Sequence, residues 1–249
     1  MSITSIRPLL RGLAIALACL VAAYLALLSS PRPLFAHHVR HQNYEVWSDQ
    51  PIPPQIERVL DDATRRLRAS PFHAPAAPLR IFICNADWRL WIYGLHFSVR
   101  VGGAADTWLT RNIYIRASDI AGNRIHSPDG GPIADAAQRP LSYFIAHEAT
   151  HIAVGRRYGR LVTLQYPEWL LEGYADYIGK GGDFDFDENL RLFKAGSAQM
   201  DLSRSGLYRG FHLEVAHLLE KEGIGLEALF ANPPEESAVR ARLSRAAAR

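Results

Sequence analysis

Hydrophobic and polar positions divide the chain into one long apolar segment and a longer stretch of mixed character. Residues 12–28 carry no charged side chain, and Arg7 and Arg11 precede them. About 20 consecutive apolar residues are enough for a helix to cross a lipid bilayer. No polar face interrupts the segment, which argues against a helix buried in a protein core. We therefore predict that residues 1–30 form an N-terminal membrane anchor or a signal segment.

A retained anchor is the favoured alternative of the two. Signal peptides usually have a shorter apolar core and small residues at the cleavage site. The best cleavage site here, residues 34–36, begins with the large Leu34. A short N-terminus inside and a large domain outside is the default orientation that we assume for such a segment. We expect a single-pass protein of the cell membrane whose domain lies on the extracytoplasmic, or periplasmic, side.

The first half of the remaining chain has the patterns of strands. Residues 31–43 include a proline-broken stretch and are interpreted as a linker. One helix is expected from residue 55, because apolar side chains recur there at helical spacing. Residues 88–97 are aromatic and fit either a strand or a helix. Alternating or continuous apolar positions predict short strands, at residues 44–49, 79–84 and 112–116.

The second half has the pattern of helices. After Pro140 the apolar positions follow helical spacing to the end of the chain. Strands followed by helices are typical of an α+β domain, which we predict for residues 44–249. A chain of 249 residues with 48% hydrophobic side chains suits one such globular domain behind the apolar segment.

Charge and cysteine content narrow the classes of function. The net charge is only +3, and lysines and arginines form no block, so binding to nucleic acid is not expected. Cys19 lies in the apolar segment and Cys84 in a predicted strand. With one of them in lipid, the two cysteines cannot form an intramolecular disulfide, so cysteine usage does not indicate the compartment.

The chemistry of the chain is concentrated in the sequence HEATH at residues 147–151. Residues four apart on a helix share one face, so His147 and His151 can present two imidazoles to one ion. A zinc ion accepts neutral imidazole, and Glu148 can then act on a water molecule as general base. The alternative is an ordinary helix with packed or solvated histidines. The apolar neighbours in this helix argue against that alternative, because burying two histidines and a glutamate without partners costs free energy.

A third ligand is expected on the next helix. Pro167 is a good first residue for that helix, and Gly179 a good last one. Glu172 lies on its apolar side and is our candidate ligand, the alternative being a surface glutamate. Asp176 follows one turn later and can hold the second nitrogen of His147 or His151, as carboxylates often do for zinc-bound histidines. A solvated aspartate is the alternative for Asp176.

At this point the chain resembles the glutamate zincins, the clan of thermolysin and of aminopeptidases with a W-x-x-E-G-x-A-x-Y-like motif. The resemblance rests on HEATH followed after 20 residues by Glu172 in WLLEGYADY, and covers about residues 140–179. It implies a zincin-like domain with His147, His151 and Glu172 as zinc ligands. By the same resemblance Glu148 is the catalytic base or acid, and Asp176 the carboxylate behind the ligands.

The resemblance also implies a group that stabilises the oxyanion and an edge strand that holds the substrate. Tyr208, in YRGF, is similar to the Y-x-K-G tyrosine of the clan and is our candidate, with His212 as the alternative. The edge strand is residues 102–106 or residues 112–116. No match to the G-x-M-E-N motif of the clan's aminopeptidases is present, which favours endopeptidase action.

These observations predict a membrane-anchored zinc metallopeptidase that hydrolyses peptide bonds with a zinc-activated water. Its partners would be a peptide or protein substrate and, through the N-terminal segment, the membrane. Two alternatives remain open. The first alternative is a zinc-stabilised binding module without catalysis. The second is a zinc hydrolase that acts on a non-peptide amide.

Overall fold

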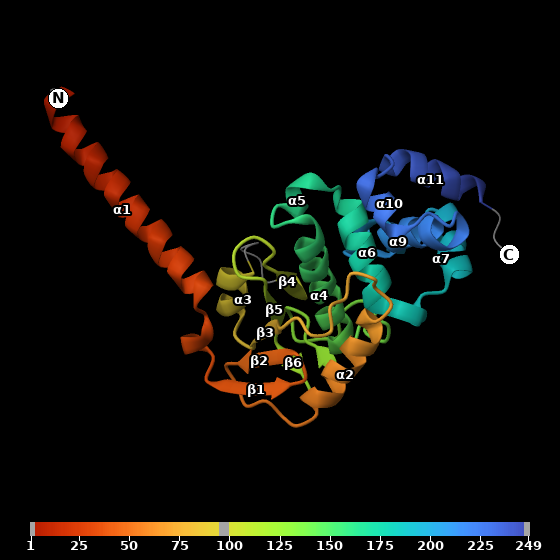
Figure 1. Ribbon diagram of the computed structural model, residues 1–249, viewed down its shortest axis with the longest axis horizontal. Coiled ribbons are helices and arrows are strands. Elements are labelled where there is room, and N and C mark those ends of the chain that lie inside the picture. Colours follow the sequence, from red (N-terminus) through yellow and green to blue (C-terminus); the bar gives the residue numbers. More distant parts are fainter. Residues whose placement is uncertain (1–2, 95–99, 247–249) are drawn as a thin grey trace.

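The chain begins with a long helix that stands apart from a folded domain (Figure 1). The computed structural model describes residues 3–94 and 100–246. The helix α1 (Ile3–Ser29) contains a stretch, Leu10–Ser29, with a mean hydropathy of 2.3. It is the one helix in the described part of the chain that is long and apolar enough to cross a membrane. The predicted N-terminal apolar helix is therefore present.

The end of α1 is joined to the domain. Leu28 is only 4% exposed and belongs to a core cluster with Phe35 and Tyr93, among others. The hydroxyl of Tyr24 donates a hydrogen bond of 2.7 Å to the carbonyl oxygen of Ile92. The last turns of α1 are thus part of the domain's packing.

The segment after α1 differs from the linker that the sequence predicted for residues 31–43. A short 3₁₀ helix, η1 (Arg32–Leu34), leads into β1 (His37–His41), which pairs antiparallel with β2 (Tyr44–Ser48). The side chains of β1 are alternately half-buried and exposed. An edge strand with three histidines and one valine lacks the apolar alternation by which strands are predicted.

A sheet of five strands forms the centre of the domain, in the order β1-β2-β3-β5-β4. The strands β2, β3 (Leu79–Cys84) and β5 (Asn112–Arg116) are parallel. The strand β4 (Gly103–Ala105) pairs antiparallel with β5 and forms one edge. A further small pair consists of β6 (Ser118–Asp119) and β7 (Arg124–Ile125). The inner strands are buried on both faces, which explains their nearly continuous apolar sequences.

The two faces of the sheet carry different elements. Ile81 and Ile113 point into the main core with α2 (Ile56–Leu67) and α4 (Leu141–Tyr158). Phe82 and Tyr114 point to the opposite face, where they meet α3 (Asp87–Tyr93) and the end of α1. The ambiguous residues 88–97 are thus helical up to Tyr93, and residues 95–97 lie outside the described part. The sheet is the middle of three layers.

Helices make up the chain after Pro140, as predicted, so the domain mixes helix and sheet with all described strands first. The helix α6 (Glu168–Lys180) packs between α4 and α9 (Arg209–Ala216) (Figure 1). The other helical elements are α5 (Val162–Gln165), η2 (Gly181–Asp183), α7 (Phe186–Lys194), η3 (Ala198–Met200), α8 (Leu202–Ser205), the π-helical turn η4 (His217–Lys221), α10 (Leu226–Ala231) and α11 (Glu236–Arg245).

The helix α9 buries a carboxyl group in the core. Glu214 is fully buried, and Arg240 approaches it to 3.3 Å without hydrogen-bond geometry. Burial raises the pKa of Glu214 to about 8, although Arg240 acts in the opposite direction. Between the ordinary pKa of 4.5 and this value, the folded state holds a proton that the unfolded state has released. The contribution of Glu214 to stability therefore falls as pH rises through this window.

We expect the Glu214→Gln variant to gain stability relative to the wild type as pH rises from about 5 to about 8, by on the order of 2 kcal/mol. Gln keeps the shape of Glu but does not ionise, so any cost of the buried amide is the same at both pH values. Denaturant unfolding of both proteins at the two pH values measures the difference. Equal pH dependence of the two unfolding free energies would contradict the prediction.

Candidate metal centre

The helix α4 carries the HEATH residues through the interior of the domain. It starts after Pro140 and ends at Gly159, whose φ of 110° is unfavourable for residues with a side chain. Most of its side chains are buried against the sheet and α6, so the helix is fixed along its length. His147 and His151 lie one turn apart and direct their Nε2 atoms to the same point, 3.3 Å from each other.

The helix α6 supplies the third group. Its N-cap is Pro167, and it ends one residue beyond the predicted Gly179, at Lys180. Glu172 faces α4, with Oε2 at 3.2 Å from Nε2 of His147 and Oε1 at 3.5 Å from Nε2 of His151. The side chain of Glu172 is 22% exposed and those of the histidines 6% and 13%, so the cluster is largely buried and Glu172 is its most exposed member.

The spacing of these three groups fits a zinc ion. Tetrahedral ligands about 2.0–2.1 Å from zinc lie about 3.3 Å from one another. The three separations among His147, His151 and Glu172 are 3.2, 3.3 and 3.5 Å. Two imidazoles and a carboxylate are a common ligand set for catalytic zinc, with a fourth position for water or substrate. The predicted ligands are therefore brought together as a group that could hold a metal ion.

The electrostatics of the cluster favour a cation. Burial lowers the pKa of His151, but Glu172 and Glu148 outweigh it and raise the pKa to about 9. Burial alone would raise the pKa of Glu172, but the two histidines outweigh it and hold the pKa far below its ordinary value. Both pKa shifts show that the environment of the three side chains stabilises one positive charge. A divalent cation supplies that charge without a proton.

Glu148 lies beside the cluster and against the edge strand. A Cβ atom added to Gly103 of β4 would lie 2.9 Å from both Cγ and Oε1 of Glu148. The residue at this position of β4 must therefore be very small for Glu148 to keep its place. Burial raises the pKa of Glu148, and the neighbouring histidines oppose this. A carboxylate with a raised pKa is well suited to accept and return a proton near neutral pH.

Tyr208 also reaches the cluster. It lies at the start of α9, and its ring stacks on that of His147 with the centroids 5.6 Å apart. Its side chain is mostly buried and lies near the carboxylates of Glu172 and Glu148. Burial, together with the nearby carboxylates, raises the pKa of Tyr208 well above its ordinary value, so the hydroxyl keeps its proton and remains a donor.

The alternative to Tyr208 is placed elsewhere. His212 is 1% exposed; its ring stacks on Phe184 at 3.5 Å, and its Nδ1 lies 2.9 Å from Asp176. These contacts hold the imidazole inside the protein. Of the two predicted oxyanion groups, Tyr208 is the one beside the cluster, where its ring stacks on that of His147.

Asp176 differs from its prediction. Its carboxylate accepts a hydrogen bond of 2.5 Å from Tyr143, in addition to the contact with His212, and lies 3.4 Å from Nζ of Lys180. The Nδ1 atom of His147 is buried without a hydrogen-bond partner. Asp176 therefore supports the site through Tyr143, whose ring lies next to that of His147 at 5.7 Å, and does not hold the imidazole directly.

The contacts that three residues make around the cluster were not predicted from the sequence. Tyr143 lies one turn before His147 on α4, a spacing that could have identified it. Lys180 is one turn after Asp176, and it is 1% exposed, which is unusual for lysine. Gly103 belongs to β4, within the residues 102–106 that the sequence offered as an edge strand, but its sequence gives no signal of its contact with Glu148.

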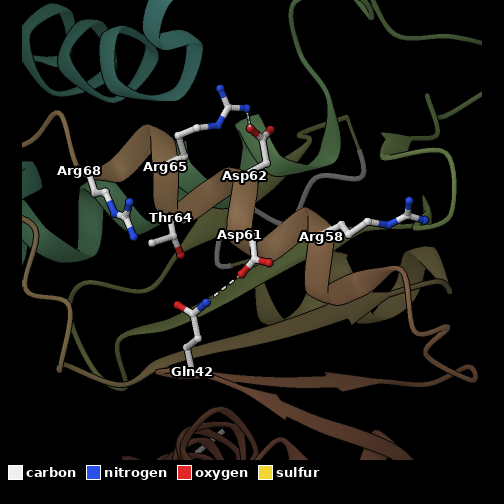
Figure 2. A pocket seen from close by; sticks show the side chains of 7 residues that line it. All are labelled: Gln42, Arg58, Asp61, Asp62, Thr64, Arg65 and Arg68. Atoms are coloured by element: carbon white, nitrogen blue, oxygen red, sulfur yellow. Dashed lines mark hydrogen bonds and ion pairs between the residues drawn. The ribbon is translucent and has the colours of Figure 1, made fainter.

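A hollow of about 610 Å³ lies on the outer side of α2. Figure 2 shows that both of its carboxylates already accept hydrogen bonds: Gln42 donates to Asp61, and Arg65 donates to Asp62. The arginines that line it point in different directions and do not converge on one point (Figure 2). We therefore place the candidate site at the cluster between α4 and α6.

Comparisons with known proteins add no family to this description. No protein-family model matches the chain, and no curated protein is significantly similar to it. The interpretation of the cluster therefore depends on its own geometry.

Proposed function

We propose that the protein is a membrane-anchored zinc metallopeptidase with a zincin-like domain. The observation that carries the proposal is the spacing of Nε2 of His147, Nε2 of His151 and the carboxylate of Glu172, all within 4.8 Å of one another. Glu148 and Tyr208 next to this triad are the two further groups that hydrolysis of an amide requires.

In the proposed mechanism, His147, His151 and Glu172 would hold the ion, which would supply a lower pKa for water and polarisation of a carbonyl group. Glu148 accepts the proton of the attacking water on its carboxylate and later delivers it to the leaving amine. The raised pKa of Glu148 suits both transfers. Tyr208 donates its hydroxyl proton in a hydrogen bond to the oxygen that becomes negative in the transition state.

The strand β4 is the proposed binding site for the substrate backbone. Alternate residues of an antiparallel strand turn their backbone groups to opposite sides. The backbone groups of Gly102 and Asp106 form hydrogen bonds with β5. Gly103 and Ala105 alternate with these residues, so their backbone N–H and C=O groups point to the outer side of the sheet. A peptide that pairs there would extend the sheet and pass beside Glu148. This supports action on extended polypeptide segments, and hence an endopeptidase.

The proposal is tested with the purified full chain in detergent micelles or nanodiscs. The full chain is required because the end of α1 packs into the domain. We expect about one zinc per chain by elemental analysis. We also expect cleavage of a quenched-fluorescence peptide library that stops with a chelator and returns with zinc. Zinc binding without cleavage of any peptide would favour the binding module or the non-peptide amide, and a folded chain without zinc affinity would reject all three functions.

The contact of Gly103 with Glu148 gives a further expectation. The extra methyl group of Gly103→Ala collides with Glu148 and with Ile115. We expect the rate of peptide hydrolysis to fall by about 10- to 100-fold, because Glu148 is displaced from the water that it activates. The zinc content is expected to be unchanged. The matched control is Gly182→Ala, where an added Cβ meets no atom within 4 Å; equal rates for both variants would contradict the prediction.

A further inference from the structure

The short helix α3 presents two large aromatic side chains to the outside. Trp88 and Trp91 are three residues apart, so they share one face of α3, and each is 46% exposed. The opposite face, with Leu90 and Tyr93, is buried against the sheet. Large exposed tryptophans on one side of a fixed helix indicate a contact surface.

The position of α3 relative to α1 indicates which kind of partner this surface contacts. The hydroxyl of Tyr24 bonds to Ile92, one residue after Trp91. Tyr24 lies five residues before the end of α1 at Ser29, which corresponds to about 7 Å along the helix axis. The polar interface on each side of a bilayer is about 5–7 Å deep. The apolar stretch Leu10–Ser29 runs to the end of α1, so with this stretch in a bilayer the contact with Tyr24 holds α3 no farther out than the interface on the side of the domain.

The packing around α1 keeps α3 at this depth. Leu28 and Phe35 are each 4% exposed in the cluster that also contains Leu90 and Tyr93 of α3. The end of the anchor and α3 therefore share one core. In Figure 1, α3 lies beside the point where α1 enters the domain, on the opposite face of the sheet from α2.

We propose that α3 is a second membrane contact, in which Trp88 and Trp91 insert into the interface of a phospholipid bilayer and seat the domain on the membrane. Tryptophan prefers this zone, because its ring is apolar and its N–H group can bond to water or headgroups. The proposal does not depend on the metal centre or on catalysis.

The experiment measures quenching of tryptophan fluorescence in nanodiscs. It uses the full chain with Trp108→Phe, since Trp108 is 49% exposed and would add a separate signal. Of the four tryptophans that remain, Trp47 and Trp169 are buried in the domain. Phosphatidylcholine brominated high on the acyl chains is compared with plain phosphatidylcholine. We expect bromine to reduce emission by about a quarter or more, because two of the four rings lie at lipid depth.

The matched variant carries Trp88→Phe and Trp91→Phe in addition. We expect quenching by brominated lipid to fall at least about twofold in this protein, while circular dichroism and the emission of the buried tryptophans in plain lipid confirm the fold. Two results would overturn the proposal: emission of the Trp108→Phe protein that is the same in both lipids, or equally strong quenching in the variant without Trp88 and Trp91.

Discussion

Replacing Glu148 by glutamine is expected to lower the rate of peptide hydrolysis by about 1,000-fold or more while the chain keeps its zinc. Glutamine has the shape of glutamate, so the contact with Gly103 is retained. It cannot accept a proton, and loss of a general base typically costs about 100- to 10,000-fold. The measurements are kcat/KM on a peptide identified from the library and zinc content of the same sample.

The control for this variant is Glu227→Gln. Glu227 is on the surface, where it pairs with Arg157 at 3.0 Å, far in sequence from the cluster. We expect full activity for this protein. If Glu148→Gln also kept full activity, the proposed base would be wrong even with zinc in place. If it lost both zinc and activity, Glu148 would be a metal ligand instead of a base.

Replacing Glu172 by alanine is expected to weaken zinc binding by about 100-fold or more, with activity lost as a consequence. Even residues that only support a ligand cost about 10- to 100-fold in metal affinity when they are replaced. Glu172 contacts both histidines, and its carboxylate lies directly against the point where a cation would sit. A zinc titration against a competing chelator, followed by thermal unfolding with and without zinc, measures the loss.

Glu168→Ala is the matched control, because Glu168 lies one turn earlier on the same helix. Glu168 is an exposed residue at the start of α6. We expect zinc affinity and the zinc-dependent increase of Tm to be the same as in the wild type. Equal zinc affinity of the Glu172 and Glu168 variants would show that α6 supplies no ligand, and the proposed metal site would then be incorrect.

Local patterns account for the part of the site that could be predicted from the sequence. The spacing of His147 and His151 depends only on helix geometry. Glu172 could be identified because Pro167 marks the start of its helix and its position falls on the apolar side. Tyr208 could be identified only by resemblance, since nothing in its local pattern indicates that its ring stacks on His147.

Contacts between distant segments account for the part that could not be predicted. Asp176 has several donors within reach on neighbouring elements, and its choice of Tyr143 and His212 depends on how α4, α6 and α9 pack. From the sequence, either residues 102–106 or residues 112–116 could form the edge strand. The pairing of the strands in the sheet distinguishes the two. The strand β5 is enclosed between β3 and β4, which leaves β4 at the edge.

The same distinction applies to the fold. The long apolar helix and the change from strands to helices near Pro140 follow from composition and periodicity. The strand β1 could not be recognised, because its histidines do not follow a strand pattern and its stability comes from pairing with β2. The burial of Leu28 was also not predictable, since a leucine inside an apolar segment has the same appearance whether it faces lipid or protein.

The connection between α1 and the domain is short, with only residues 30–36 before β1, and part of it is packed in the core. With α1 in a bilayer, the cluster is held at a constant height above the membrane and diffuses laterally with the anchor. Encounters with a substrate in the same membrane are then governed by the number of molecules per unit area. Under the proposed function, the rate of peptide hydrolysis in cells is expected to follow the surface density of both partners and to be insensitive to the volume of the surrounding compartment.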